Sequence, residues 1–378
     1  MQKRRGYGWC LPLAMGLMAM LAVSPGLLWA VEEPDALMDE LLGPALDTSE
    51  TQKKGETVYM PIPMSNPTIG TGAALAAMTL FPMDEKSKVS DVTFAGLYTN
   101  SDSWAAGGLA RLNMKEDRLR LKFGAGYFDM NLSFFGIGAR PIGVVPTEIP
   151  INQEGTFAIA EALWDVGGKV YVGPSYRYLR VSSSLNFDNP LEPLEIVSSG
   201  PGLRISWDTR NNLMNPSQGF RANFNVDTSM ESMGGDRDYE IYKASYSHYF
   251  DLEENRILAT RITGCAASTK APFYDICLFG SGKALRGYVG GEYRDDRMVT
   301  VEAEYRWRFS ERFGLVAFAG VGQIAPTFGE MGSGNKYLSG VGGGLRFLAS
   351  KEHKVNLSVD WAKGENSDAL YFYIGEAF

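Results

Sequence analysis

From about residue 56 to its end, the chain alternates between apolar and polar residues over long stretches. In residues 301–309 the odd positions are apolar or aromatic, whereas the even positions are charged (Glu302, Glu304, Arg306 and Arg308). Residues 219–227 and 355–361 repeat this period of two. Because successive side chains of a β-strand point to opposite faces, the pattern predicts strands with one apolar and one polar face.

Sixteen such runs, separated by turn residues, follow residue 56. They are expected at residues 57–65, 68–81, 88–100, 103–115, 118–131, 154–167, 169–182, 199–210, 217–230, 238–251, 256–268, 297–310, 312–327, 336–350, 353–365 and 368–378. Connections after even-numbered runs are mostly short, whereas the two longest, residues 132–153 and 269–296, follow odd-numbered runs. Short turns on one side and long loops on the other are typical of outer-membrane barrels, and an even strand count places both chain ends on the turn side.

A soluble sheet with one face in water is the usual explanation of such alternation. Strand length and aromatic placement favour a membrane barrel instead. Runs of about 11 to 14 residues exceed ordinary strands and suit a tilted membrane strand. Aromatic residues recur near strand ends on the apolar face, as interfacial girdles require; they include Trp207, Tyr246, Tyr305, Trp307 and Phe309. Since lipid tolerates no open sheet edge, we predict an all-β fold, a 16-stranded antiparallel transmembrane β-barrel of the bacterial outer membrane, over residues 56–378.

Two segments precede the predicted barrel. Residues 1–30 combine a basic start, an apolar stretch and Ala30 before an acidic sequence, which is typical of a secretory signal peptide. An uncleaved anchor helix is the alternative, but the apolar stretch of about 15 residues is shorter than the roughly 20 that a membrane helix needs. Residues 31–55 are predicted to form a short acidic periplasmic tail.

Composition narrows the possible partners and chemistry. The chain has 36 Lys and Arg against 44 Asp and Glu, and loss of the three basic residues in the leader would leave 33 and a net charge of −11. Such a surface repels phosphate backbones, so nucleic acid is not an expected partner. Two histidines, and two cysteines beyond the leader, are too few for a zinc or iron–sulfur site and leave little for histidine catalysis. No metal, cofactor or enzymatic activity is expected.

Three short motifs stand within the predicted barrel. The string LRGY occupies residues 285–288 in the long loop after the eleventh strand, residues 202–220 contain DTRN and PSQG, and the chain ends in GEAF. These motifs resemble the (V/I/L)RG(F/Y), strand–turn–strand and terminal G-x-x-F elements of the bacterial surface antigen superfamily, the BamA/TamA-like barrels. The resemblance covers about residues 56–378.

The resemblance implies a barrel that aids insertion or translocation of proteins or lipids at the outer membrane. Family members usually carry POTRA repeats or an enzymatic domain before the barrel, whereas about 25 residues separate the leader from the first strand here, so a barrel lacking POTRA domains is implied. Its expected partners are outer-membrane lipid and lipopolysaccharide, with other outer-membrane proteins or lipids as cargo. The alternative is a passive pore or a structural barrel, because charged inward positions suit either function.

The resemblance also implies that the loop motif folds back into the lumen. The motif consists of Leu285, Arg286, Gly287 and Tyr288. The family's thirteenth strand usually reads F-x-D-x-G, but Gly320 stands at the acidic position here. We therefore expect Arg286 to pair with Glu304 or, second, Glu302 on the charged face of the preceding strand, because a guanidinium in a narrow barrel needs a carboxylate. Gly287 would permit a close backbone approach, and Tyr288 would pack the loop against the wall.

Cys265 and Cys277 are the cysteines that remain after the leader, and they bracket the start of the same loop. In an oxidising compartment we predict a disulfide between them. The alternative is that both cysteines stay unpaired and serve only as small side chains. Closing this short segment would stabilise the base of the loop by roughly 2 to 3 kcal/mol on the chain-entropy model.

The first predicted strand contains two prolines, Pro61 and Pro63. Residues two apart direct their N–H groups toward the same neighbouring strand, so one edge lacks two donors. We expect this edge to face the last strand, which ends in Phe378, and to form a weak seam that opens laterally to pass a substrate strand into lipid. The alternative is that the prolines merely lie near the periplasmic rim.

Overall fold

The computed structural model describes residues 57–378, apart from residues 67, 139–148, 186–192, 214, 254, 281–284, 333–336 and 351–353. The predicted signal peptide and the acidic tail lie outside the described residues. In the part of the chain that is described, no helix is long and apolar enough to cross a membrane.

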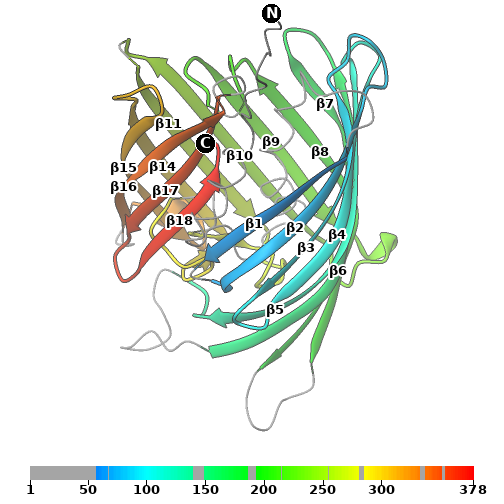
Figure 1. The fold of residues 1–378 in the computed structure, drawn as a ribbon. Helices are drawn as coiled ribbons and strands as arrows, with labels where there is room; N and C mark the ends of the chain where they lie inside the picture. Colours follow the sequence, from blue (N-terminus) through cyan, green and yellow to red (C-terminus); the bar gives the residue numbers. More distant parts are fainter. Residues whose placement is uncertain are drawn as a thin grey trace, which may run out of the picture.

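Sixteen strands form one antiparallel sheet that curves around a central axis (Figure 1). Strands that follow one another along the chain lie side by side in the sheet, and two short strands, β12 and β13, pair separately inside the loop between β11 and β14. The strands are β1 (Thr57–Asn66), β2 (Gly70–Phe81), β3 (Ser90–Thr99), β4 (Trp104–Met114), β5 (Leu119–Phe134), β6 (Ile149–Asp165), β7 (Val170–Leu185), β8 (Leu194–Asp208), β9 (Gly219–Ser229), β10 (Tyr239–Asp251), β11 (Arg256–Ala267), β12 (Cys277–Leu278), β13 (Arg294–Asp295), β14 (Arg297–Trp307), β15 (Phe313–Ala325), β16 (Leu338–Ser350), β17 (Val355–Lys363) and β18 (Asp368–Ile374). The all-β, 16-stranded antiparallel fold predicted from the alternation is confirmed.

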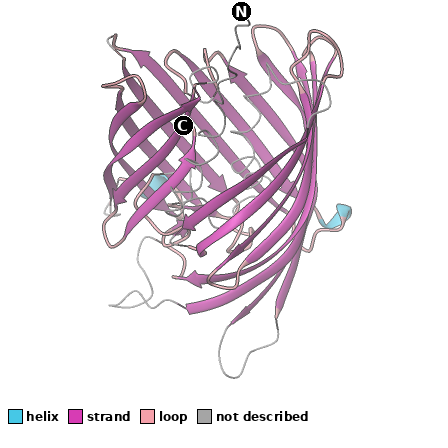
Figure 2. Cartoon of the chain, viewed as in Figure 1, coloured by secondary structure: helices cyan, strands magenta, loops and turns pink. Residues whose placement is uncertain are grey.

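Strands account for most of the described chain, and the helices among the described residues are two single turns, η2 (Glu231–Met233) and η3 (Phe328–Glu330) (Figure 2). Some predicted strand bounds were wrong. β6 and β8 each begin five residues earlier than expected, and β18 ends at Ile374, four residues before Phe378. The β5–β6 hairpin continues to the pair Phe134↔Ile149, because backbone pairing extends it past the region where alternation marks a strand.

The two faces of the sheet differ in exposure as the alternation predicts. Val301 is 44% exposed, whereas its neighbour Glu302 is 6% exposed and Glu304 is fully buried. The aromatic side chains at strand ends point outward, and Trp207 contacts Phe220 on the next strand with ring centroids 4.7 Å apart. The outer surface is therefore apolar, and the charged positions of β14 face the interior.

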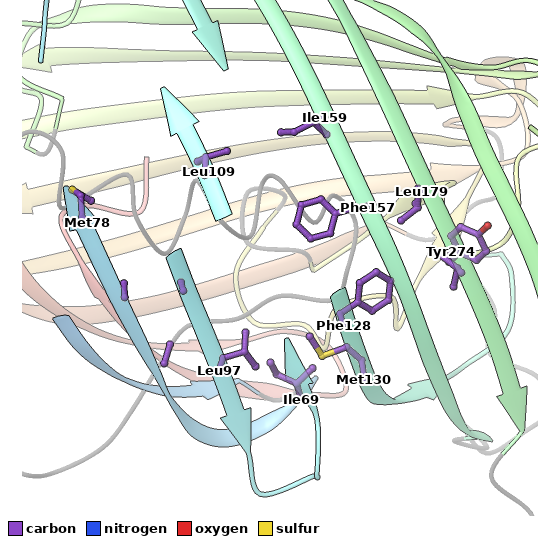
Figure 3. Close-up of a cluster of buried hydrophobic side chains, with 14 of the residues drawn as sticks. Ile69, Met78, Leu97, Leu109, Phe128, Met130, Phe157, Ile159, Leu179 and Tyr274 are labelled. Carbon is purple, nitrogen blue, oxygen red and sulfur yellow. The ribbon is translucent and has the colours of Figure 1, made fainter. Parts of the chain in front are cut away.

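The inner wall carries a large apolar cluster and a dense group of charged side chains. From β2 to β8 it carries a cluster of buried apolar side chains, including Met78, Leu109, Phe128 and Ile159 (Figure 3). Tyr274, from the loop between β11 and β14, packs into the same cluster. The charged group lies on β14 to β18 and the C-terminal residues, and the loop reaches it.

The strand order also defines the two ends of the barrel. Because the strand number is even, β1 begins and β18 finishes at one end, here called the turn end, and the loop between β11 and β14 leaves the opposite end, here called the loop end. β1 and β18 are the two edge strands and lie side by side (Figure 1). Among the described residues, no ladder pairing joins these two edges, and their junction is here called the seam.

Candidate functional site

The connection between β11 and β14, residues 268–296, is here called the inner loop, and its described parts, residues 268–280 and 285–296, fold into the barrel (yellow in Figure 1). Its aromatic side chains pack on one another: Tyr288 lies edge-on to Phe279 with ring centroids 5.1 Å apart and to Tyr293 at 5.8 Å. All three are at most 1% exposed. The Tyr288 hydroxyl donates to the Ser339 carbonyl at 2.6 Å, so this side chain fastens the loop to β16.

Arg286 of the LRGY motif lies among three carboxylates of the inner wall. Its Nη2 is 2.8 Å from Glu302 Oε1 and 2.6 Å from Glu304 Oε2, and its Nη1 is 2.5 Å from Asp360 Oδ2. The guanidinium also lies over the Phe318 ring, 3.4 Å from its centroid. Arg286 is 4% exposed, so the carboxylates replace the water that a free guanidinium would keep.

The ion pairs extend beyond the loop arginine. Arg306 Nε lies 2.6 Å from Glu304 Oε1, and Arg346 Nη1 lies 2.5 Å from Asp360 Oδ1. Arg346 also pairs with Glu376 at 2.7 Å, and the Tyr373 hydroxyl donates to Asp360. β14, β16, β17 and the C-terminal residues thus form one charge network that holds the docked arginine. Each charge in it depends on its partners, because an unpaired buried charge is costly.

Glycines on the inner wall make room for the motif. A Cβ at Gly320 would lie 2.3 Å from Leu285 Cδ1, and one at Gly364 would lie 2.5 Å from the Gly287 carbonyl oxygen. The position where the family has an acidic residue is therefore filled by Leu285, and the acidic partners lie on β14 and β17 instead. Gly287 has a φ of +112°, a conformation that favours glycine.

A second anchor holds the other side of the inner loop. Asp275 accepts two hydrogen bonds from Arg177 of β7, at 2.8 and 2.5 Å. The hydroxyl of Tyr239, from β10, donates to the same carboxylate at 2.6 Å. Arg177 and Asp275 are 4% and 2% exposed. The loop is thus fixed to opposite walls, near β7 and near β14 to β17.

The remaining sequence-predicted residues lie as follows. Cys265 at the end of β11 and Cys277 in β12 form a disulfide. Pro61 and Pro63 lie in the edge strand β1, opposite Leu75 and Ala73 of β2. Phe378, expected at the seam, lies beyond β18 in a buried cluster with Tyr249 and Ala259, where Arg306 donates to its carbonyl oxygen at 2.7 Å.

Sequence reasoning missed Asp360, Arg346 and the Arg177–Asp275 pair. The alternation of residues 355–361 places Asp360 on the polar face, so its inward direction could have been inferred. Its proximity to Arg286, 74 positions away, could not, because strand pairing alone does not say where a long loop docks.

Burial also affects the acidic groups within the inner loop. It raises the pKa of Glu292, although hydrogen bonds to its carboxylate, first among them the one from Ser367, act in the opposite direction. Burial likewise raises the pKa of Asp295. Among the described residues, no group of three or more His, Cys, Asp or Glu side chains is arranged to hold a metal ion. The site as described is an interface between a loop and a wall.

Comparisons with solved structures identify barrels of the same fold. BamA from Haemophilus ducreyi lacking POTRA domains 1–3 is 13% identical, with a TM-score of 0.59 over 85% of this chain and 70% of that one. CdiB from Acinetobacter baumannii (14% identical, TM-score 0.58) and CdiB from Escherichia coli (12%, 0.58) match 85% of this chain. The matches span 60% and 63% of those two chains, so this chain covers less than two thirds of either CdiB. No curated protein matches by sequence.

A family model supplies the remaining comparison. The Omp85 superfamily domain matches residues 197–378, which include the inner loop, the charge network and the strand–turn–strand segment. The resemblance that the LRGY and neighbouring motifs indicated agrees with this match and with the barrel fold of BamA and CdiB. The chain is therefore an outer-membrane β-barrel with a BamA/TamA-like fold, and its residues 197–378 match the Omp85 superfamily domain.

Proposed function

We propose that this barrel aids the insertion or translocation of proteins or lipids at the outer membrane, without catalysis. The observation that carries the proposal is the inner loop, which crosses the lumen from Arg177 to the acidic cluster around Arg286. A loop fixed to two walls obstructs free diffusion. It suits a barrel whose substrate passes by displacing the loop or along the seam.

The seam supports the same proposal. β1 and β18 lie side by side, yet the described residues show no ladder between them. Pro61 and Pro63 remove donors from β1, and an edge with unpaired carbonyl groups can accept a strand from another chain. The cargo is accordingly another outer-membrane protein or lipid, with membrane lipid and lipopolysaccharide surrounding the barrel.

A deletion strain tests this function. We expect changed levels of a subset of outer-membrane proteins, or disturbed lipid asymmetry, in quantitative proteomics and lipid assays. The wild-type gene should restore them, whereas a variant with cysteines cross-linked between β1 and β18 should not. Full complementation by the cross-linked variant would rule out lateral opening.

A passive pore is the second candidate, and the charged inward face of β14 is the observation that favours it. Conductance of the purified barrel in a planar bilayer separates the two functions. The insertion or translocation proposal predicts low conductance in the wild type. Steady solute flux, together with an unchanged outer-membrane proteome in the deletion strain, would support the pore instead.

A further inference from the structure

Residues 287–293 of the inner loop, here called the strap, hold the C-terminal edge of the sheet. The Gly287 N–H donates to the Tyr371 hydroxyl of β18 at 2.8 Å. In the β17–β18 turn, Ser367 donates to the Gly287 carbonyl at 2.8 Å and to Glu292 Oε2 at 3.0 Å. Next to these contacts, Arg286 forms its buried ion pairs with β14 and β17. The strap is thus bound to this edge by charged and neutral contacts together.

The same strap also reaches the N-terminal edge. The Gly290 N–H donates to the Thr68 hydroxyl at 2.9 Å. Thr68 lies in the turn between β1 and β2 at the loop end of the barrel, and the next residue, Ile69, is 1% exposed and packs in the apolar cluster of the inner wall. Only two residues therefore separate the contact with β18, at Gly287, from the contact with the β1–β2 turn, at Gly290.

We propose that the strap closes the loop end of the seam and that the Gly290–Thr68 contact is its latch. Between the described parts of β1 and β18 no ladder pairing is present, so cross-links of this kind must contribute to holding the edges together. A neutral hydrogen bond to a partly exposed hydroxyl is weaker than a buried, charge-assisted network. Opening therefore begins at Thr68, and the strap stays with β17 and β18.

The latch gives the proposed function a point of control, because a seam must open at one end before a strand or lipid can enter it. The latch itself is a property of the empty barrel. Its test needs no cargo, so the latch and the proposed function can fail separately.

The test follows the exposure of one buried position on each edge. Single cysteines replace Ile69 in the β1–β2 turn or Ala369 in β18, which are 1% and 4% exposed. Each is placed in the chain without the predicted leader, in which the two remaining cysteines are bonded to each other. The rate of modification by a membrane-impermeant maleimide is measured on folded barrels in liposomes. Folded protein is selected by its compact mobility on unheated gels.

Thr68→Val keeps the shape of the side chain and removes the acceptor. We expect it to raise the modification rate at position 69 about fivefold, the change that loss of one neutral hydrogen bond typically brings. The rate at position 369 should stay unchanged because the strap remains on that edge. Thr68→Ser retains the hydroxyl and should label at the parental rate.

Thr57→Val is the matched control. Thr57 begins the same edge strand at the turn end, opposite the loop end where the strap lies, and its hydroxyl is 3.0 Å from that of Thr79. It should leave both rates unchanged. The proposal is overturned if Thr68→Val has no effect at position 69, if Thr57→Val matches it, if Thr68→Ser behaves like Thr68→Val, or if both positions accelerate together.

Discussion

The salt-bridge cluster around Arg286 makes the sharpest prediction about the inner loop. Arg286→Ala leaves Glu302, Glu304 and Asp360 buried with two arginines in place of three, Arg306 and Arg346. Removing one partner of a buried pair costs about 3 to 5 kcal/mol. Docking of the loop should weaken by that amount, which is a factor of roughly 150 to 5,000 in the population of the undocked loop.

The double-mutant cycle with Glu304→Ala separates direct contact from general damage. Arg286 keeps Glu302 and Asp360 when Glu304 is removed, so Glu304→Ala should weaken docking less than Arg286→Ala does. The double variant should be less damaged than the sum of the singles. We expect a coupling free energy of about 1 to 3 kcal/mol, since residues in one network couple by that order.

Proteolysis measures the docking. The rate of thermolysin cleavage within residues 269–296 of the folded barrel reports the undocked population, and the ratios among the four proteins give the coupling free energy. Arg180→Ala is the control, because Arg180 pairs with Glu195 on the exposed surface and should leave cleavage nearly unchanged. Strict additivity, or wild-type protection in Arg286→Ala, would refute this account of the loop.

Three further predictions concern the same loop. Gly364→Ala should expose it to protease, since a Cβ there would lie 2.5 Å from the Gly287 carbonyl oxygen, whereas Gly264→Ala, with no atom near its Cβ, should be silent; equal effects would contradict the close approach. Replacing Cys265 and Cys277 by serine should loosen the loop base by roughly 2 to 3 kcal/mol in the same assay, and labelling of unreduced, denatured wild type should find no free thiol. Because burial raises the pKa of Glu292, the docked loop binds that proton more tightly than the undocked loop. Its contribution to docking should therefore grow as pH falls from neutral through the raised pKa and level off below the ordinary carboxyl value, and Glu292→Gln should abolish this growth in hydrogen-exchange protection.

The fold class could be predicted from the sequence because successive residues of a strand alternate between its two faces. Lipid on one side and a polar lumen on the other impose a period of two, as residues 301–309 show. Each strand carries that signal by itself, so the count of sixteen needed no tertiary information. Strand ends beyond the lipid, as in the β5–β6 hairpin, lack the signal, and there the bounds were wrong.

Only part of the candidate site could be predicted from the sequence. The LRGY motif indicated Arg286 as a site residue, and the charged face of residues 301–309 indicated Glu302 and Glu304 as its partners. These were local patterns, and the structure brings all three together. Asp360 and the Arg177–Asp275 pair come from segments 74 and 98 positions apart, and no local pattern connects them.

The sequence by itself determined which side chains face lipid and which face the lumen, because that choice is made residue by residue along each strand. Only the tertiary structure decided that Asp360 joins Glu302 and Glu304 around Arg286. It also decided that Leu285 occupies the space at Gly320 and that the strap touches both Thr68 and Tyr371. These contacts depend on where a long loop lies after the sheet has curved around it. Loop docking depends on contacts between residues far apart in the sequence, whereas the face to which a strand residue points is specified by its position along the strand.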